Sequence, residues 1–554
     1  MLEIALSNVD KNFGFKKIFD TFNLEVMSGE KVGLIGPNGC GKSTLFKLII
    51  KEEIPSSGIV TTRKGANIGF LPQMPTFENE NISVRDYLNS SFEKIYKISK
   101  ELRLLEYEMA NSKNVDMEKI LNRYGSLQQK FFDLGGYVMD SKINEICNKF
   151  GIDYEILERN FSKLSGGERT IVCFAKIMLS NPDILLLDEP TNNLDIYTLE
   201  LLEKFLQNYT GTVIMSSHDR YFLDKVATKI VLIERGKSEI FHGNYSYYLK
   251  ENERRILSEF EQYKDQQKMV DAMKRKIKQL QEFGRKASPS GEAFFKRAAS
   301  IQKRLDKIEL LNKPETAKEI PLNFQMANRS GKQVLIVHDL NMSIDNKVLL
   351  KQVSFDILFK DRTCLMGKNG CGKSTLIKHI IDLYDKENYN ENNIKIGSNV
   401  LIGYIPQVIE FADDNQTLLD VARRTFNGTE TQLRSSLAKF LFYGNDVFKR
   451  VNMLSGGEKV RLKLFELIQQ NINFLIMDEP TNHIDITTRE VLESALNEFQ
   501  GTILFISHDR YFINEIAKKI LYVENNNIKE YLGNYDDYRN TKEKQLSLIN
   551  GKIK

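Results

Sequence analysis

Residues 36–44 read GPNGCGKST and residues 367–375 read GKNGCGKST, so nearly the same nine-residue pattern occurs twice in this chain of 554 residues. An apolar run precedes each copy, VGLI in the first and TCLM in the second. Glycines in such a pattern let successive backbone N–H groups point toward phosphate oxygens at the start of a helix. Each copy therefore predicts a phosphate-binding loop between a buried parallel strand and a helix.

Four further motifs also occur twice and in the same order. In both copies, 24 residues separate the serine of LSGGE from the glutamate of DEP, and 29 separate that glutamate from the histidine of SHD. Independent short motifs do not hold such spacing, so the chain is predicted to be a duplication. The paired motifs are IGFLPQ (68–73) and IGYIPQ (402–407), LSGGER (164–169) and LSGGEK (454–459), ILLLDEPTNNLD (184–195) and FLIMDEPTNHID (474–485), and SHDRYF (217–222 and 507–512).

One interval differs between the copies. It spans 92 residues from Gln73 to Ser165 but 48 from Gln407 to Ser455, so the first copy carries 44 more. This insertion, at about 91–135, has mixed charge and reads as a helical hairpin broken near Asn111–Asn114. It could also be a simple packing embellishment.

The composition is that of a globular chain of two or three domains, with 41% hydrophobic and 27% charged residues. No apolar run approaches the ~18 residues of a membrane span, and the N-terminus does not read as a signal peptide. Five cysteines without metal-ligand spacing indicate a reduced, cytoplasmic protein. The net charge is +4, but residues 271–310 carry eleven Lys/Arg against five Asp/Glu, so the positive charge is local.

The repeated motifs have the chemistry of a nucleoside triphosphatase that binds ATP with Mg²⁺. Lys42 and Lys373 would reach the β- and γ-phosphates, and Ser43 and Ser374 would bind Mg²⁺. The runs before DEP predict central strands that place carboxylates at the sheet edge where α/β folds bind ligands. The other predicted roles are Asp188 and Asp478 in the Mg²⁺ shell, Glu189 and Glu479 as general bases for the attacking water, Gln73 and Gln407 at the metal and γ-phosphate, and His218 and His508 at the γ-phosphate.

Simpler interpretations exist for the same residues. Acidic residues can merely end strands, and a lone histidine is more often structural than functional. Two histidines at the same offset from a predicted general base favour the functional interpretation.

LSGGE, with the phosphate loop, the glutamine, DEP and SHD in that order, resembles the ATP-binding cassette over roughly 450 of the 554 residues. The resemblance implies two α/β cassettes paired head to tail, each ATP lying between one phosphate loop and the other cassette's LSGGE. Ser455, Gly456 and Gly457 would then close on the ATP held by Lys42, and Ser165, Gly166 and Gly167 on the one held by Lys373. The remaining residues implied in nucleotide binding are Gly36, Asn38, Gly39, Gly41, Thr44, Gly367, Asn369, Gly370, Gly372 and Thr375, with Asp195 and Asp485 at the seam.

The family usually stacks adenine on an aromatic residue some two dozen positions before the phosphate loop. Phe13 has this offset in the first copy, whereas the corresponding position in the second is Ile344. We therefore expect weaker stacking at the second site and two ATP sites that are not equivalent.

The segment between the cassettes predicts two long antiparallel helices. Ile256, Tyr263, Val270 and Ile277 recur every seven residues, and a 3/4 spacing of apolar residues runs from Phe294 to Ile308. The stretch QEFGRKASPSGEAFFKR (281–297) between them predicts a helix ending near Phe283 and a basic tip at about 284–291. The domains are expected at 1–244, 245–320 and 321–554.

Two in-line cassettes, an insertion in the first and a charged helical linker resemble the ABC-F family of ribosome-binding translation factors. The resemblance implies a monomer on the 70S ribosome, with the linker in the tRNA exit site, the tip toward the peptidyl-transferase centre and the insertion at the L1 stalk. A solvated hairpin is the plainer interpretation of the linker, but one-signed charge suits RNA phosphates, and the resemblance implies that these belong to 23S rRNA and P-site tRNA. The residues expected to contact RNA are Arg275, Lys276, Arg285, Lys286, Lys296 and Arg297.

The resemblance favours a member that protects the peptidyl-transferase centre from antibiotics, such as lincosamides, pleuromutilins and streptogramin A. The alternative is a housekeeping factor that acts on P-site tRNA of stalled ribosomes. A transporter's detached ATPase is a third possibility, which leaves the basic linker unexplained.

Overall fold

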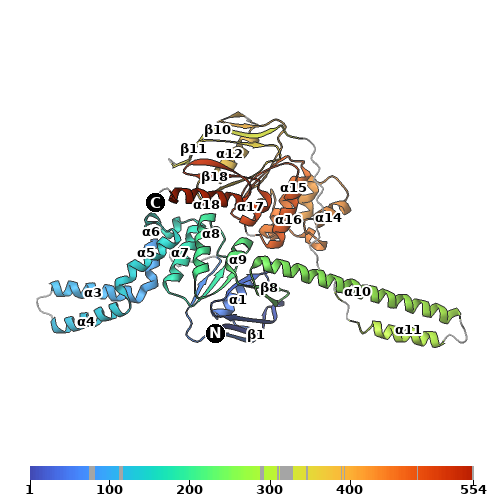
Figure 1. Cartoon of the computed structure of the whole chain (residues 1–554), viewed down its shortest axis with the longest axis horizontal. Coiled ribbons are helices and arrows are strands. Elements are labelled where there is room, and N and C mark those ends of the chain that lie inside the picture. Colours follow the sequence, from blue (N-terminus) through green and yellow to red (C-terminus); the bar gives the residue numbers. More distant parts are fainter. Residues whose placement is uncertain are drawn as a thin grey trace. The chain divides into compact units, whose positions relative to one another are not determined.

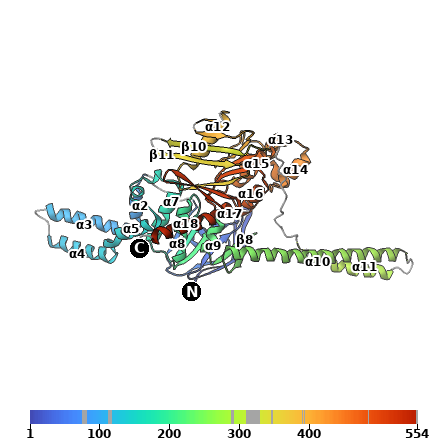
Figure 2. The same ribbon diagram turned by 45° about the horizontal axis from the view of Figure 1, so that its top comes forward.

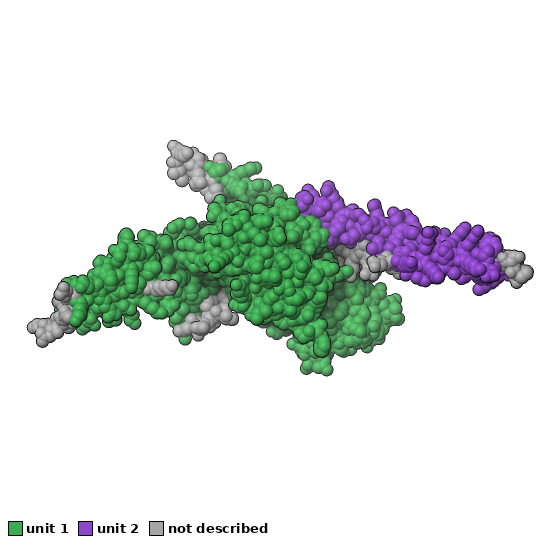
Figure 3. All heavy atoms as spheres, turned by 90° about the horizontal axis from the view of Figure 1, so that it is seen from below, with its two compact units in different colours: residues 1–244, 321–554 green, residues 245–320 purple. Residues whose placement is uncertain are grey.

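The computed structural model describes residues 1–73, 81–111, 117–286, 292–308, 311, 329–344, 347–387, 390–391, 393–482 and 484–551. The chain forms two compact units: Met1–Asn244 with Pro321–Lys554, and Tyr245–Ile320 (Figure 3). The first unit contains both predicted cassettes, and the second is the predicted linker. No helix among the described residues is long and apolar enough to cross a membrane.

The first cassette has two sheets. One is antiparallel, in the order β2-β1-β4, and the other has the order β5-β6-β7-β3-β8-β9, parallel except for β9. Its elements are β1 (Leu2–Phe13), β2 (Lys16–Met27), β3 (Lys31–Ile35), α1 (Lys42–Ile49), β4 (Ser57–Thr62), β5 (Ile68–Leu71), α2 (Val84–Asn89), α3 (Glu93–Asn111), α4 (Met117–Asp133), α5 (Met139–Phe150), α6 (Tyr154–Leu157), α7 (Gly166–Leu179), β6 (Ile184–Asp188), α8 (Ile196–Asn208), β7 (Thr212–Ser216), α9 (Arg220–Val226), β8 (Lys229–Glu234) and β9 (Lys237–Phe241).

The second cassette repeats this plan. Its antiparallel sheet has the order β11-β10-β14-β13 and its larger sheet β15-β16-β17-β12-β18-β19. Its elements are β10 (Gln333–Ile344), β11 (Lys347–Leu358), β12 (Arg362–Gly367), α12 (Lys373–Asp385), β13 (Asn390–Glu391), β14 (Ile394–Ile396), β15 (Ile402–Ile405), α13 (Leu418–Thr425), α14 (Glu430–Ala438), α15 (Gly456–Gln469), β16 (Phe474–Asp478), α16 (Ile486–Glu498), β17 (Thr502–Ile506), α17 (Arg510–Ile516), β18 (Lys519–Glu524), β19 (Asn527–Leu532) and α18 (Tyr535–Gly551). Short 3₁₀ turns cover Ser90–Phe92, Gly136–Val138, Phe161–Lys163, Gly444–Phe448 and Val451–Met453.

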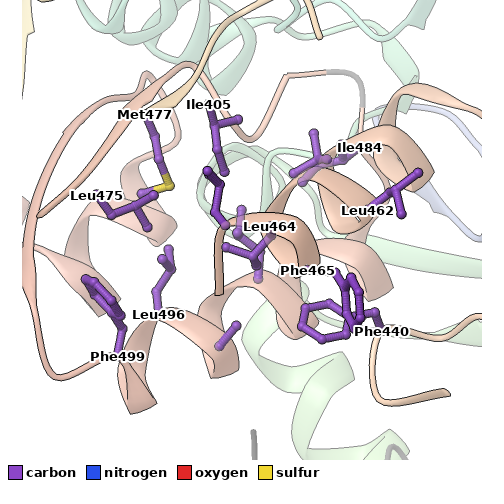
Figure 4. Packing of buried hydrophobic residues seen from close by; sticks show 14 of the residues in the cluster. Ile405, Phe440, Leu462, Leu464, Phe465, Leu475, Met477, Ile484, Leu496 and Phe499 are labelled. Atoms are coloured by element: carbon purple, nitrogen blue, oxygen red, sulfur yellow. The ribbon is translucent and has the colours of Figure 1, made fainter. Parts of the chain in front are cut away.

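The sequence pattern explains these sheets. Every residue of the apolar strands β6 and β16 is buried, as expected for central parallel strands covered on both faces. Strand β2 alternates buried and exposed residues along its second half, because its sheet is antiparallel and covered on one face. The core of the second cassette packs β16 against α15 and α16, with the rings of Phe440 and Phe465 meeting edge to face at 5.5 Å (Figure 4). The tandem α/β architecture predicted from the sequence is confirmed.

The insertion in the first cassette forms helices α3 and α4, which run side by side (Figures 1 and 2). Leu105, Ile120 and Leu127 are buried between them. The helical hairpin is therefore confirmed, and the predicted break falls at the end of α3 and on residues 112–116, which lie outside the described residues.

The linker unit consists of α10 (Tyr245–Lys286) and α11 (Glu292–Leu305), which pack side by side (Figures 1 and 2). Ile277, Leu280 and Ala298 form its buried apolar seam. Helix α10 extends three residues beyond the predicted end at Phe283 and continues through Gly284. Gly284 is buried against Phe295, so close that a Cβ there would lie 2.7 Å from the ring. The predicted Ser-Pro-Ser break at 288–290 lies outside the described residues.

Candidate active sites

Each phosphate-binding loop follows the central strand of a larger sheet and begins a helix. Gly41 and Gly372 adopt φ of 111° and 100°, a left-handed conformation that favours glycine, immediately before α1 and α12. The lysines that follow fold back over their own loops: Lys42 Nζ donates to the Gly36 carbonyl at 2.9 Å and Lys373 Nζ to the Gly367 carbonyl at 2.8 Å. Both loops thus hold an amine where a phosphate would lie.

The carboxylates after β6 and β16 are held at the same sheet edge. In the first cassette, Ser216 Oγ donates to Asp188 Oδ1 at 2.7 Å and accepts from the Glu189 N–H at 3.0 Å. In the second, Ser374 Oγ of the phosphate loop donates to Asp478 Oδ1 at 3.1 Å. In the second cassette, the structure therefore brings Ser374 and Asp478, both expected in the Mg²⁺ shell, into direct contact.

Glu189 and its neighbour His218 have the electrostatics of a general base beside a neutral imidazole. Burial raises the pKa of Glu189 to about 7, although Lys42 counteracts this. Burial lowers the pKa of His218 to about 3, and the positive charges of Lys42 and Arg489 lower it further. The His218 N–H donates to Glu189 Oε2 at 3.2 Å, and His218 Nε2 lies 3.4 Å from Oε1. A carboxylate that titrates near neutrality is suited to proton abstraction.

The second cassette repeats this arrangement. Burial raises the pKa of Glu479 to about 7 and lowers the pKa of His508 to about 3. The His508 N–H donates to Glu479 Oε2 at 3.2 Å, and His508 Nε2 lies 3.3 Å from Oε1. Glu189 and Glu479 also adopt positive φ, 50° and 48°, which is uncommon for a residue with a side chain and is frequent at functional sites.

The LSGGE motifs fold as helix caps. Ser165 and Ser455 cap α7 and α15, and the glutamates three residues later complete a capping box in each case. A Cβ on Gly167 would lie 2.5 Å from the Asn193 carbonyl oxygen, so only glycine fits there. The motif thus presents a helix N-terminus, which attracts anions.

A cavity of about 880 Å³ surrounds the second phosphate loop. The first cassette contributes the predicted Ser165, Gly166 and Gly167 to it, together with Asn193. The second cassette contributes Ile344, Leu349, Asn369, Gly370, Gly372, Lys373, Ser374, Thr375, Gln407, Glu479, Asn482, Ile506 and His508. The Asn369 N–H also donates to Asp195 Oδ2 at 3.2 Å, so Asp195 lies at the seam between the cassettes.

A cavity of about 550 Å³ surrounds the first phosphate loop. The first cassette contributes Phe13, Lys16, Ile18, Asn38, Gly39, Gly41, Lys42, Ser43, Thr44, Gln73, Asp188, Glu189, Asn192 and His218. The second cassette contributes Ile484 and Arg489; Ser455, Gly456 and Gly457 are not among the described residues that line this cavity. Among the described residues, the opposite LSGGE therefore lines the second cavity and is not part of the lining of the first.

Buried ion pairs also join the cassettes at this seam. Arg220 on α9 donates to both carboxylate oxygens of Glu493 on α16, at 2.9 and 3.4 Å. Arg510 on α17 donates from Nη2 to one carboxylate oxygen of Glu203 on α8, and the same Nη2 donates to Asp219 Oδ2 at 3.3 Å. Both arginines come from SHDR, so the motif that carries the histidine also carries the inter-cassette contact.

Sequence reasoning missed several of the residues that line the cavities. Asn192 and Asn482 occupy the same place in the repeated DEPTN motif, so the duplication could have identified them. Arg489 gave no such signal, because the corresponding residue of the first copy is Leu199.

The donors at both loops suit Mg²⁺, which prefers oxygen ligands and is held by one or two carboxylates together with substrate phosphates. Serine hydroxyls, aspartates and glutamines supply such oxygens. The described residues contain no group of three or more His, Cys, Asp or Glu that could hold a metal by itself.

Comparison with known proteins identifies the family. The profile of the ABC transporter family matches residues 19–192 and 350–482, and a second profile with the same description matches residues 231–324. ABC transporter F family member 5 of Arabidopsis thaliana is 34% identical over 97% of this chain and 77% of that protein. The energy-dependent translational throttle protein EttA of Haemophilus influenzae is 33% identical over 96% of this chain and 94% of that protein.

A solved complex of the archaeal ribosomal stalk protein aP1 and the ribosome recycling factor aABCE1 has the same fold. It gives a TM-score of 0.60 at 16% identity and covers 97% of this chain and 92% of that one. With both cassettes matched by the family profile and with relatives above 30% identity over nearly the whole chain, the protein belongs to the ABC-F family and hydrolyses ATP.

Proposed function

We propose that this protein is an ATP-driven switch that binds the 70S ribosome as a monomer, with its linker in the tRNA exit site. ATP closes the cassettes, the closed form binds the ribosome more tightly, and hydrolysis releases it. The observation that carries this proposal is a long, basic helical hairpin on a twin-cassette ATPase without any described membrane-spanning helix.

The hydrolytic chemistry is assigned to the paired carboxylates. Glu189 and Glu479 orient the attacking water and accept its proton, a role that their pKa near 7 supports. The neutral His218 and His508 contact the γ-phosphate. Asp188 with Ser43 and Gln73, and Asp478 with Ser374 and Gln407, would hold Mg²⁺, which would neutralise phosphate charge when bound.

The linker is assigned to RNA because basic residues outnumber acidic residues around its tip, eleven to five over residues 271–310. Helix α10, with 42 residues, is roughly 63 Å long at 1.5 Å per residue. Its last turn carries Arg285 and Lys286, both exposed. The other residues assigned to RNA are also exposed: Arg275, Lys276, Lys296 and Arg297. Phosphate contacts made by such residues supply sequence-independent affinity for RNA.

The α3–α4 hairpin is assigned to the L1 stalk. Helices α3 and α4 carry seven Lys/Arg against six Asp/Glu, so the hairpin has less net positive charge than the linker. A protein surface or a mixed RNA–protein surface therefore suits it better than bare RNA.

Two finer roles are compatible with binding at the exit site. The first, suggested by the basic tip, is protection of the peptidyl-transferase centre against lincosamides, pleuromutilins and streptogramin A. The second is a housekeeping action on P-site tRNA of stalled ribosomes, and the similarity to a protein named as a translational throttle favours it.

Charge reversal on the linker tests the ribosome assignment. We expect Arg285→Glu with Lys286→Glu to weaken co-sedimentation with ribosomes by about ten-fold or more, because two phosphate contacts are lost and replaced by repulsion. Lys264→Glu with Lys268→Glu is the matched control on the same helix, since Lys268 lies roughly 25 Å from Arg285 at 1.5 Å per residue. Equal losses in the two variants, or none in either, would remove the assignment of the tip to RNA.

Drug susceptibility separates the two finer roles. A strain without the protein should show a lower inhibitory concentration for the three drug classes if protection is the role. Unchanged inhibitory concentrations, together with slower recovery of stalled ribosomes, would support the housekeeping role.

A further inference from the structure

Arg489 is a buried cation of the second cassette that lines the ATP cavity of the first. It lies on α16, four residues after Asp485. Its Nη1 donates to Asp509 Oδ2 at 2.6 Å, and its Nη2 donates to the Thr481 carbonyl at 3.2 Å, both within its own cassette. The same Nη1 donates across the seam to the carbonyl of His218 at 2.7 Å. One guanidinium therefore connects the two cassettes at the residue assigned to the γ-phosphate.

The first cassette has no equivalent cation. Its copy of the same helix is in register, because Glu200 and Glu203 occupy the places of Glu490 and Glu493, yet Leu199 stands where the second has Arg489. The described residues that the first cassette contributes to the second cavity are Ser165, Gly166, Gly167 and Asn193, none of which is charged. The asymmetry is thus chemical as well as geometric.

We propose that Arg489 is a positioning residue that acts from the second cassette on hydrolysis at the first ATP site, and that the second site operates without a counterpart. The proposal rests on the roles given above to Glu189 and Glu479. It adds that the two sites hydrolyse ATP under different conditions. The first site does so only when α16 of the second cassette has docked against the first cassette.

The contacts indicate how such a residue works. By donating to the His218 carbonyl, Arg489 fixes the backbone whose N–H donates to the Glu189 carboxylate. Asp509 and Thr481 hold the Arg489 guanidinium to the second cassette. When the cassettes separate, the guanidinium therefore moves away with the second cassette, and the His218 carbonyl of the first site loses its hydrogen bond.

The test measures each site separately. Single-turnover hydrolysis is followed in a Glu479→Gln chain, where the first site keeps its general base, and in a Glu189→Gln chain, where the second does. Arg489→Leu, which copies Leu199, is introduced into both. We expect it to slow the first site by about ten-fold or more and to change the second by less than about three-fold.

Two readouts distinguish positioning from a structural effect. The ATP concentration that saturates the rate should change less than the rate itself. Arg489→Lys should restore part of the rate, since a lysine keeps the charge.

A control addresses damage to the helix. Arg362 donates to the carbonyls of Leu496, Asn497 and Phe499 at the C-terminal end of α16, away from both cavities. Arg362→Met should therefore destabilise the same helix without a preference between the sites. Equal slowing of both sites by Arg489→Leu, or a rate at the first site within about two-fold of its parent, would overturn the proposal. If neither glutamine substitution slows hydrolysis in the otherwise unchanged protein, the assignment of the general bases fails instead.

Discussion

The buried pair of Arg220 and Glu493 gives a quantitative prediction for cassette closure. The two residues come from opposite cassettes and are 4% and 8% exposed, with two hydrogen bonds between them. Glu493→Leu leaves a buried guanidinium without its carboxylate, and breaking such a pair costs about 3–5 kcal/mol. Since the pair crosses the seam, this cost falls on the closed state and lowers the closure equilibrium roughly 100-fold or more, at 1.4 kcal/mol per factor of ten.

The reciprocal change should cost less. Burial raises the pKa of Glu493 to about 7, so without Arg220 the carboxyl can take up a proton and become neutral. The Arg220 guanidinium cannot become neutral in this way, because arginine does not lose its proton in proteins. Arg220→Met is therefore expected to weaken closure less than Glu493→Leu, and the double variant to recover much of the loss, because no unpaired charge stays buried.

The assay is apparent ATP affinity in a Glu189→Gln, Glu479→Gln chain, which closes on ATP without turning it over. Because ATP binding is linked to closure, the apparent affinity for ATP should fall by about the same factor as the equilibrium constant for closure. Glu430→Leu is the control, because Glu430 pairs on the surface with Arg434 and such pairs contribute about 0–1 kcal/mol. If the double variant loses as much free energy as the sum of the two single variants, the pair is not coupled and the reasoning is wrong.

Three further predictions concern the sites and the linker. Hydrolysis should rise with pH through about 7, because Glu189 and Glu479 must lose their protons to act as bases, and a rate profile from pH 6 to 8 measures this. Phe13→Ala should raise the ATP concentration needed for half-maximal rate at the first site, as measured in the Glu479→Gln chain, whereas an unchanged value would remove the stacking role. Gly284→Leu should push the linker helices apart at Phe295, cost about 1–3 kcal/mol of linker packing and weaken ribosome binding while the ATPase rate is maintained.

Most of the fold could be predicted from the sequence because local pattern and tertiary environment agree. The apolar runs before DEP are central strands, and the linker residues Val270 and Ile277, which recur seven residues apart, are both buried. The predicted end of α10 lay three residues too early. Gly284 looks like a helix breaker in the sequence, but in the structure its lack of a side chain allows close packing against Phe295.

The candidate sites were predictable within each cassette and less so between them. Repetition of motifs identified most of the residues that each cassette provides to its own cavity, although Asn192 and Asn482 were missed. It gave no information on Arg489, where the copies differ, or on which LSGGE motif closes over which loop, since that depends on how two folded surfaces meet. The carboxylate partners of Arg220 and Arg510 also lie far along the chain, without a motif that marks them.

The most direct test of the account is sedimentation of the Glu189→Gln, Glu479→Gln protein with 70S ribosomes, with and without ATP. If ATP closes the cassettes and the closed form binds, this protein should pellet with ribosomes when ATP is present and stay in the supernatant when it is absent. Association that is equal in the two conditions would contradict the switch, and no association in either would contradict the ribosome as the partner.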